Sequence, residues 1–376
     1  MSHRSLDFVH TGPGTPAGRY LRSFWQPIFH SADLAAGRAK PVKVMNEQFT
    51  LYRGEGGTAH LVEFRCAHRR AQLSVGWVEE DAIRCFYHGW KYDSDGQCIE
   101  QPPEPKSFAS RVKIKSYPVR EYIGLVFAYL GEGEPPEFPR FPDFEEFEGI
   151  RQYSTYRRAC NYFNNLENFL DVTHLGFVHR DHVGGFDGRF DSISLEVEET
   201  EWGATCRHVR ASGRKGQTQF GMPNIMHLKG FPIAPHIIGH REVIAWWVPI
   251  DDENHFRFAI EAVRMKNDQL QLYETTQRET YGKRTLDKAV LAEKIVNGEI
   301  SLYDFPQEST DFPHLVDDVA QISQGRIPDR ENETLGRGDA GVLLIRRIWA
   351  REMTAFLEGR PTKAWRYNEA LETAKL

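Results

Sequence analysis

The chain has 376 residues, of which 40% are hydrophobic and 27% charged, a globular composition that predicts about two domains and excludes long disorder. Lysine and arginine number 47 against 53 acidic residues, a formal net charge of −6, so nothing favours a nucleic-acid partner. The apolar stretches are too short to span a bilayer and the N-terminus has no signal-peptide core. Five cysteines, an odd number, do not indicate a disulfide framework. We therefore expect a cytoplasmic protein without a membrane partner.

The first third of the chain has the pattern of a small all-β domain. Short apolar runs alternate with turn signals, and Gly56-Gly57 and Asp95-Gly96 have the composition of hairpin turns. The predicted strands are Pro41–Leu51, His60–Phe64, Ala82–Phe86 and Ile123–Leu130.

A proline-rich connector over residues 132–149 separates this part from a second one. Proline at that density disfavours both helix and central strand, and indicates a semi-rigid link. After it, Ser192–Arg210 and Glu242–Val263 alternate as strands do, whereas three other segments have helical patterns. The predicted helices are Asn161–Leu175, Gln269–Val296 and Ala340–Leu357. The second part is therefore predicted to be α+β, an antiparallel sheet with helices.

Two cysteines of the first domain stand beside histidines in matching arrangements. Cys66-Ala67-His68 and Cys85-Phe86-Tyr87-His88 are separated by 16 residues. Four such ligands could hold Zn²⁺, or a [2Fe–2S] cluster with two cysteines on one iron and two histidines on the other. Zinc sites usually pair like ligands within one loop, whereas each loop here carries one of each type, as a Rieske centre requires. The remaining cysteines are expected to be small core residues: Cys98, Cys160 and Cys206.

A second candidate metal site follows the connector. Asn168, Asp171 and His174 recur at every third position, so on a helix they would share one face. His179 comes five residues after His174, which requires a distortion that Gly176 would permit. Two imidazoles and a carboxylate from elsewhere make the facial triad of non-haem Fe(II) oxygenases. His182 is a weaker candidate ligand.

The segments RCAHRRAQLS (residues 65–74) and RCFYHGWKYDSDGQC (residues 84–98) resemble the Rieske domain of ring-hydroxylating oxygenases. The resemblance covers residues 20–131, which leaves residues 1–19 as an N-terminal segment and residues 150–376 as the catalytic domain. One departure is Arg70, which stands where the family commonly has glycine. The family also carries the Asn/Asp/His/His pattern of the second site. The resemblance implies that His174 and His179 bind a mononuclear iron, and that Asn168 and Asp171 have catalytic roles.

The third iron ligand is expected downstream, in the segment over residues 317–330, which is also similar to the family. In relatives of the phthalate dioxygenase type, the ligand aspartate lies eight residues before a glycine that matches Gly325. Counting back gives Asp317, with Asp318 as the alternative. Ile322 departs from the family, which often has glutamate at that position.

The resemblance implies a terminal oxygenase subunit of the phthalate dioxygenase and O-demethylase branch. Its cofactors would be a Rieske [2Fe–2S] cluster and Fe(II), with O₂ as co-substrate. No dinucleotide-binding glycine motif is present, so NAD(P)H would act only through a separate flavin- or ferredoxin-type reductase. A small methoxylated, optionally carboxylated, aromatic substrate would undergo O-demethylation. The alternatives are ring hydroxylation or dihydroxylation, N-demethylation and, without enzymatic activity, a Rieske electron carrier.

The resemblance further implies a head-to-tail homotrimer in which Asp171 accepts hydrogen bonds from His174 and from the partner subunit's His88. Three cations beside the cluster loops are candidates for docking the reductase. The substrate pocket is expected along residues 227–249, with Phe231, Trp246 and Trp247, and an arginine would bind a substrate carboxylate. The docking candidates are Arg69, Arg70 and Lys91, and the arginine candidates are Arg207, Arg210 and Arg241.

Overall fold

The computed structural model describes residues 7–180, 194–209, 213, 215–234, 237–281, 288–305 and 312–367. Its contacts divide the chain into two units, residues 10–138 and residues 1–9 with 139–376. This division falls inside the proline-rich segment over residues 132–149. Among the helices in these ranges, none has the length and apolar character needed to cross a bilayer.

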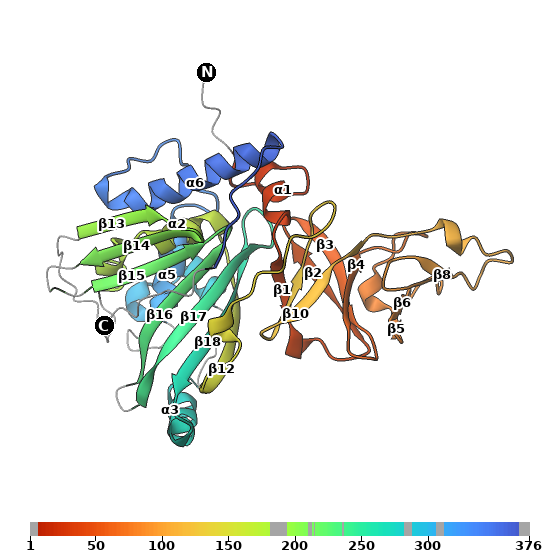
Figure 1. Cartoon of the computed structure of the whole chain (residues 1–376), viewed down its shortest axis with the longest axis horizontal. Coiled ribbons are helices and arrows are strands. Elements are labelled where there is room, and N and C mark those ends of the chain that lie inside the picture. Colours follow the sequence, from red (N-terminus) through yellow and green to blue (C-terminus); the bar gives the residue numbers. More distant parts are fainter. Residues whose placement is uncertain are drawn as a thin grey trace. The chain divides into compact units, whose positions relative to one another are not determined.

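The unit over residues 10–138 is built from three antiparallel sheets and one short helix (Figure 1). The strand orders are β1-β11-β10, β2-β3-β4-β9 and β5-β6-β7-β8. The elements are α1 (Pro16–Arg22), β1 (Gln26–His30), β2 (Arg38–Val44), β3 (Glu47–Arg53), β4 (Ala59–Glu63), β5 (Trp77–Glu79), β6 (Ala82–Arg84), β7 (Lys91–Tyr92), β8 (Cys98–Glu100), β9 (Ser116–Tyr117), β10 (Val119–Tyr122) and β11 (Leu125–Ala128).

The turns of this unit explain which strand predictions hold. Gly57 and Gly96 have φ of 95° and 79° in the turns after β3 and β7, which confirms both predicted hairpins. The single predicted strand Pro41–Leu51 is wrong, because it is a hairpin of β2 and β3. Its two-residue turn places Met45 and Asn46 at φ of 50° and 64°, as a type I′ turn requires. Methionine is an unusual residue at such a position, which is why this turn could not be predicted from its residue types.

The second unit contains a seven-stranded antiparallel sheet in the order β12-β18-β17-β16-β15-β14-β13 (Figure 1). Two predicted strand segments are hairpins, β13 with β14 and β17 with β18. The strands are β12 (Gly149–Arg158), β13 (Ser194–Glu199), β14 (Gly203–Val209), β15 (Lys215–Gly221), β16 (Ile225–Ala234), β17 (Ile237–Pro249) and β18 (His255–Met265). The helices are α2 (Tyr162–Leu170), α3 (Leu270–Tyr281), α4 (Lys288–Val296), α5 (Phe312–Ser323) and α6 (Ala340–Leu357).

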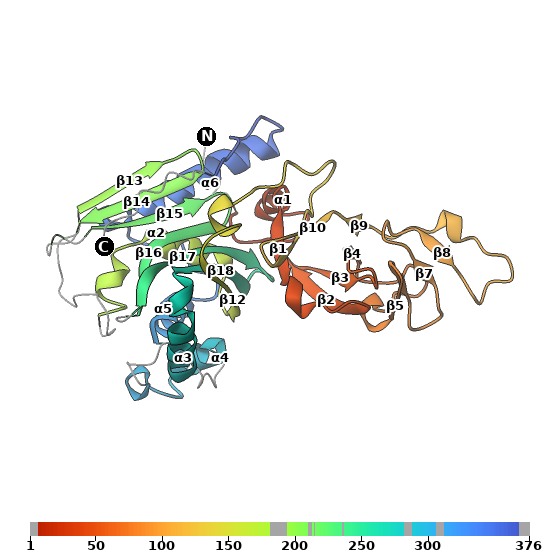
Figure 2. The same ribbon diagram turned by 60° about the horizontal axis from the view of Figure 1, so that its bottom comes forward.

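Helices and connecting segments cover opposite faces of this sheet. Side chains alternate along β17, so Trp247 packs against Phe169 of α2 while Trp246 packs against Phe141 on the other face. Figure 2 shows α3, α4 and α5 gathered on one side of the sheet. Phe8, near the start of the chain, stacks on Phe163 of α2, with ring centroids 5.0 Å apart. The predicted fold class, a β domain followed by an α+β domain, is confirmed.

The helix predicted over Asn161–Leu175 is too long, since α2 ends at Leu170. Asp171 has extended backbone angles (φ −85°, ψ 92°), and its Oδ1 accepts hydrogen bonds from the amide and the hydroxyl of Thr173 at 2.9 and 2.5 Å. An aspartate that binds the backbone two residues ahead competes with helix formation. His174 therefore lies in a separate 3₁₀ turn (His174–Gly176), and the prediction that it shares a helix face with Asn168 and Asp171 is wrong. Within the predicted helix Gln269–Val296 the structure describes α3 and α4, and residues 282–287 lie outside the described part.

Candidate metal centres

Two loops of the first unit have the same backbone construction. In one, the amide of Cys66 donates to the carbonyl of Ala71 (2.8 Å), and the amide of Arg70 donates to the carbonyl of Cys66 (3.1 Å). In the other, the amide of Cys85 donates to the carbonyl of Trp90 (2.8 Å), and the amide of Gly89 donates to the carbonyl of Cys85 (3.0 Å). Each loop therefore holds its cysteine and its histidine on a single tight turn.

The two loops bring all four predicted cluster ligands together. Cys66 and Cys85 are each 1% exposed and are hydrogen-bonded through their thiols, which lowers the pKa of Cys85 to about 6 and raises that of Cys66. The rings of His68 and His88 lie 4.7 Å apart. Within the described residues, the buried Nδ1 atoms of both histidines have no hydrogen-bond partner. Two sulfurs and two orphaned imidazole nitrogens are the donor set of a [2Fe–2S] cluster with mixed ligation.

Two aromatic residues that the sequence reasoning did not single out support this site. The hydroxyl of Tyr92 lies 3.1 Å from Sγ of Cys66 and accepts a hydrogen bond from the amide of Ala67 at 3.1 Å. Trp90 stacks on the ring of His68 with centroids 4.6 Å apart. Both residues follow His88 within the same quoted motif, so their position beside the ligands was the available signal. Hydrogen bonds to a cluster sulfur and burial around it are the features by which a protein tunes such a centre.

Substitutions at the matching turn positions of the two loops should shift cluster stability in opposite directions. Arg70 has φ of 59° and Gly89 has φ of 74°, and a left-handed residue with a side chain costs roughly 1–2 kcal/mol. Arg70→Gly should therefore raise the temperature at which the visible absorption of the cluster is lost. Gly89→Ala should lower it, because the added Cβ is strained and would lie 3.3 Å from Pro102.

Arg69→Gly is the matched control for Arg70→Gly. It removes the same charge from the neighbouring position, at which φ is not positive. If both glycine variants raise the midpoint equally, charge rather than backbone strain is the cause.

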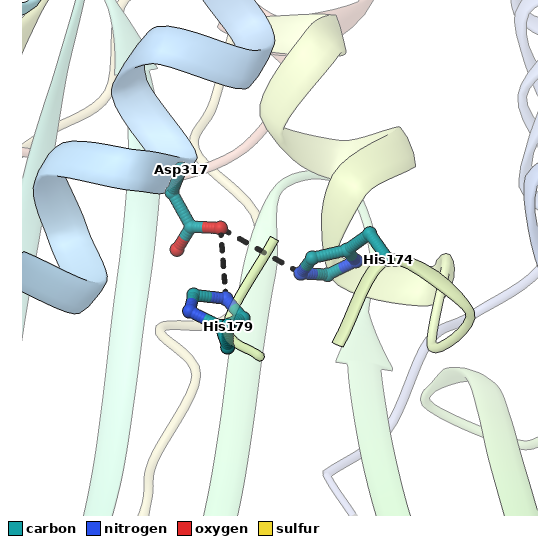
Figure 3. Close-up of side chains that lie close together, drawn as sticks. All are labelled: His174, His179 and Asp317. Carbon is teal, nitrogen blue, oxygen red and sulfur yellow. Dashed lines mark ion pairs between the residues drawn. The ribbon is translucent and has the colours of Figure 1, made fainter. Parts of the chain in front are cut away.

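In the second unit, His174, His179 and Asp317 meet (Figure 3). Their ligand atoms all lie within 4.8 Å of one another. Oδ1 of Asp317, on α5, lies 3.2 Å from Nε2 of His179 and 3.6 Å from Nε2 of His174. Two imidazole nitrogens and one carboxylate oxygen that converge in this way fit a 2-His-1-carboxylate site for Fe(II).

The structure separates the two adjacent acids that the sequence left as alternatives. Asp318 is 0% exposed and forms an ion pair with Arg158, whereas Asp317 faces the histidines. Burial raises the pKa of Asp318 to about 6 against the effect of Arg158. Burial also acts on Asp317, but the closeness of His179, His174 and Arg158 holds the pKa of Asp317 well below its ordinary value.

Asp171 contacts His174 differently from the expectation. Nδ1 of His174 donates to the backbone carbonyl of Asp171, whereas the carboxylate Oδ2 is 4.0 Å from that nitrogen and Oδ1 binds Thr173. A donor bond at Nδ1 leaves Nε2 as the metal-binding nitrogen, so the carbonyl fixes the ring in the required tautomer. Asn168 is half-buried in the last turn of α2.

The other candidates have mixed placements. Arg69 and Arg70 are exposed, but Lys91 lies within 3.1 Å of Glu79 and 3.7 Å of Glu100, so it is held in ion pairs on its own sheet. Cys98, Cys160 and Cys206 are buried free thiols, as predicted.

The structure describes the side chains of four pocket candidates, Trp246, Trp247, Arg207 and Arg241. Trp246 and Trp247 are 1% and 2% exposed and pack in the core. Arg207 pairs with Glu198 at 2.5 Å, and Arg241 lies 3.8 Å from Glu261. His182, Arg210 and the side chain of Phe231 lie outside the described residues.

Each of the two units contains one family match. Residues 24–118 match the Rieske [2Fe-2S] domain, and residues 158–273 match the vanillate O-demethylase oxygenase C-terminal domain. The first match contains all four ligands of the cysteine–histidine site and decides for a [2Fe–2S] cluster over zinc.

Relatives of known activity are similar over nearly the whole chain. The 5,5'-dehydrodivanillate O-demethylase oxygenase subunit of Sphingobium sp. (strain NBRC 103272 / SYK-6) is 30% identical over 95% of this chain and 81% of its own. The tert-butanol monooxygenase / tert-amyl alcohol desaturase oxygenase subunit of Aquincola tertiaricarbonis is 31% identical over 92% of this chain and 75% of its own. The oxygenase in a complex of carbazole 1,9a-dioxygenase with ferredoxin has the same fold, with a TM-score of 0.66 at 21% identity over 88% of this chain and 90% of that one.

Proposed function

The chain belongs to the Rieske non-haem iron oxygenases, as an oxygenase subunit of the O-demethylase and phthalate dioxygenase branch, and we propose that it removes a methyl group from a methoxylated aromatic compound. The similarity to the dehydrodivanillate O-demethylase subunit over 95% of the chain carries this proposal. Enzymes of this family use a [2Fe–2S] cluster, a mononuclear iron and O₂.

The residues of the two centres have distinct roles in this proposal. The thiolates of Cys66 and Cys85 and Nδ1 of His68 and His88 hold the cluster, and His174, His179 and Asp317 hold the iron. When loaded, the two centres supply electron transfer and O₂ activation. The carbonyl of Asp171 orients His174, and Arg158 keeps Asp318 away from the ligand set. Asn168 and the carboxylate of Asp171, which are assigned catalytic roles, both lie at the C-terminal end of α2.

Electrons come from NAD(P)H through a separate flavin- or ferredoxin-type reductase. The exposed side chains beside the cluster loops suit its docking: Arg69, Arg70, Phe86 and Tyr87, of which the two aromatics are 60% and 55% exposed. In the proposed head-to-tail homotrimer, Asp171 accepts a hydrogen bond from the partner subunit's His88.

A second candidate reaction is hydroxylation of a small tertiary alcohol. It is favoured by the 31% identity to the tert-butanol monooxygenase subunit over 92% of the chain. Both reactions consume one O₂ and two electrons, but only O-demethylation releases formaldehyde, because hydroxylation of an O-methyl group gives a hemiacetal that collapses to a phenol and formaldehyde.

The first test is the iron and acid-labile sulfide content of anaerobically purified protein. About three irons and two sulfides per chain are expected, because the cluster supplies two of each and the mononuclear site one more iron. The loaded protein, with a ferredoxin-type reductase and NADH, should then release formaldehyde and a phenol from vanillate-type substrates. Turnover of tert-butanol without formaldehyde from any methoxyarene would favour the second candidate, and two irons without restoration by Fe(II) would favour an electron carrier.

A further inference from the structure

A buried arginine connects the two elements that carry the iron ligands. Arg158, the last residue of β12, is 2% exposed. Its Nη1 donates to Oδ1 of Asn165 on α2, and its Nε forms the ion pair with Oδ1 of Asp318 on α5. Its Nη2 donates to the hydroxyl of Tyr156 on its own strand at 3.0 Å. The planar guanidinium therefore ties α2 and α5 to the edge strand of the sheet through three separate nitrogens.

Two of these contacts lie on elements that carry or lead into an iron ligand. Asp318 follows Asp317 on the same helix, where successive side chains are about 100° apart, so fixing one carboxylate sets the direction of the other. Asn165 lies on α2, and this helix ends four residues before His174. Arg158 thus connects, through buried polar contacts, the element that supplies the carboxylate and the element that leads into the histidines.

Charge gives Arg158 a second effect. Asp318 is fully buried. Burying a carboxylate without a partner costs so much free energy that, without Arg158, Asp318 would pair with another cation. Besides Lys288, which also acts on Asp318, an iron held by the adjacent Asp317 would be such a cation. The ion pair with Arg158 therefore removes a competing ligand from the site.

We propose that Arg158 is a positioning residue of the iron site, which sets the geometry of Asp317 relative to His174 and His179 by linking Asp318 to Asn165. This inference rests on the proposed iron site. The polar contacts of Arg158 are with Asn165, Tyr156 and Asp318 rather than with the three ligands, so its effect is on metal affinity and geometry.

The experiment compares variants of the full-length protein with its [2Fe–2S] cluster in place. Anaerobic titration with Fe(II) gives the Kd of the mononuclear site, and the EPR spectrum of the nitric oxide adduct of bound Fe(II) reports its geometry. Arg158→Met should weaken Fe(II) binding by about 10–100-fold, the usual effect of losing a residue that orients a metal ligand, and should alter the EPR spectrum. Arg158→Lys keeps the charge but loses the planar guanidinium that binds three partners at once, so we expect its Fe(II) affinity to lie between those of Arg158→Met and the wild type.

The double variant Arg158→Met/Asp318→Leu separates positioning from charge balance. It removes both members of the buried pair, so the fold should regain its stability, yet the link between α2 and α5 is still absent. We expect its Fe(II) affinity to stay well below wild type. A folded double variant with the wild-type Kd and EPR spectrum would overturn the proposal, as would an unchanged Kd in Arg158→Met.

Arg330→Met is the matched control, because Arg330 also binds α2, through Glu167 at 2.8 Å and Asn164 at 3.2 Å, rather than α5. It should lower the temperature of unfolding and leave the Fe(II) Kd at the wild-type value. A similar loss of Fe(II) affinity in Arg330→Met would attribute the effect to α2 stability in general and overturn the specific role of Arg158. A wild-type protein that binds no Fe(II) would instead contradict the proposed function.

Discussion

Replacing Asp317 with alanine is expected to remove the mononuclear iron and leave the [2Fe–2S] cluster unchanged. The carboxylate oxygen that lies 3.2 Å from His179 and 3.6 Å from His174 is lost, whereas the cluster ligands belong to the other unit. Iron should fall from about three to about two per chain with sulfide constant at about two. Turnover should fall by at least about 10³-fold, because the metal supplies several kcal/mol of the lowering of the barrier.

Asp329→Ala is the control for this variant. Asp329 is an exposed acid in the turn after α5 and accepts hydrogen bonds from the amide of Glu331 and the side chain of Asn332. It should keep about three irons per chain. If Asp317→Ala also keeps the third iron, the carboxylate ligand is another residue, with Asp318 the next to test.

The cluster site could be predicted because it is local. Each cysteine lies on the same short turn as its histidine, so the spacing within Cys66–His68 and Cys85–His88 contains the geometry that the site needs. The final step, the approach of the two loops, follows from short strand pairings between β5, β6, β7 and β8. Tyr92 and Trp90, which contact the cluster ligands, lie in the same motif. No rule of spacing distinguishes such aromatic residues from ordinary core residues.

The iron site depends on contacts that are distant in sequence. Nothing in the segment Asp317-Asp318 distinguishes the two acids, because the distinction comes from Arg158, on a strand of the sheet. The end of α2 was missed for a different reason. The spacing of Asn168, Asp171 and His174 suits a helix, but the side chain of Asp171 binds Thr173 and ends it, and local hydrogen bonding of this kind overrides periodicity.

Replacing Asp171 with asparagine is expected to retain both metal centres and to lower turnover by about 10–100-fold, in line with other residues that orient metal ligands. Asparagine keeps an oxygen for the amide and hydroxyl of Thr173, and the backbone carbonyl that binds Nδ1 of His174 is unaffected. What is lost is the negative charge that, in the proposed trimer, accepts a hydrogen bond from the partner subunit's His88. The measurement is the rate at which O₂, in the presence of substrate, reoxidises the reduced cluster in a single turnover, followed by visible absorption.

Thr173→Val distinguishes the charge of Asp171 from its role in the turn after α2. It removes the hydroxyl that donates to Oδ1 at 2.5 Å but keeps the amide donor at 2.9 Å and the carboxylate charge. If the charge connects the two centres, Thr173→Val should reoxidise its cluster at nearly the wild-type rate while Asp171→Asn is slow with its iron in place. Loss of iron from Asp171→Asn would mean that the carboxylate serves to hold the His174 turn. Full activity in Asp171→Asn would exclude the bridging role, because an asparagine side chain cannot supply the charge that such a bridge requires.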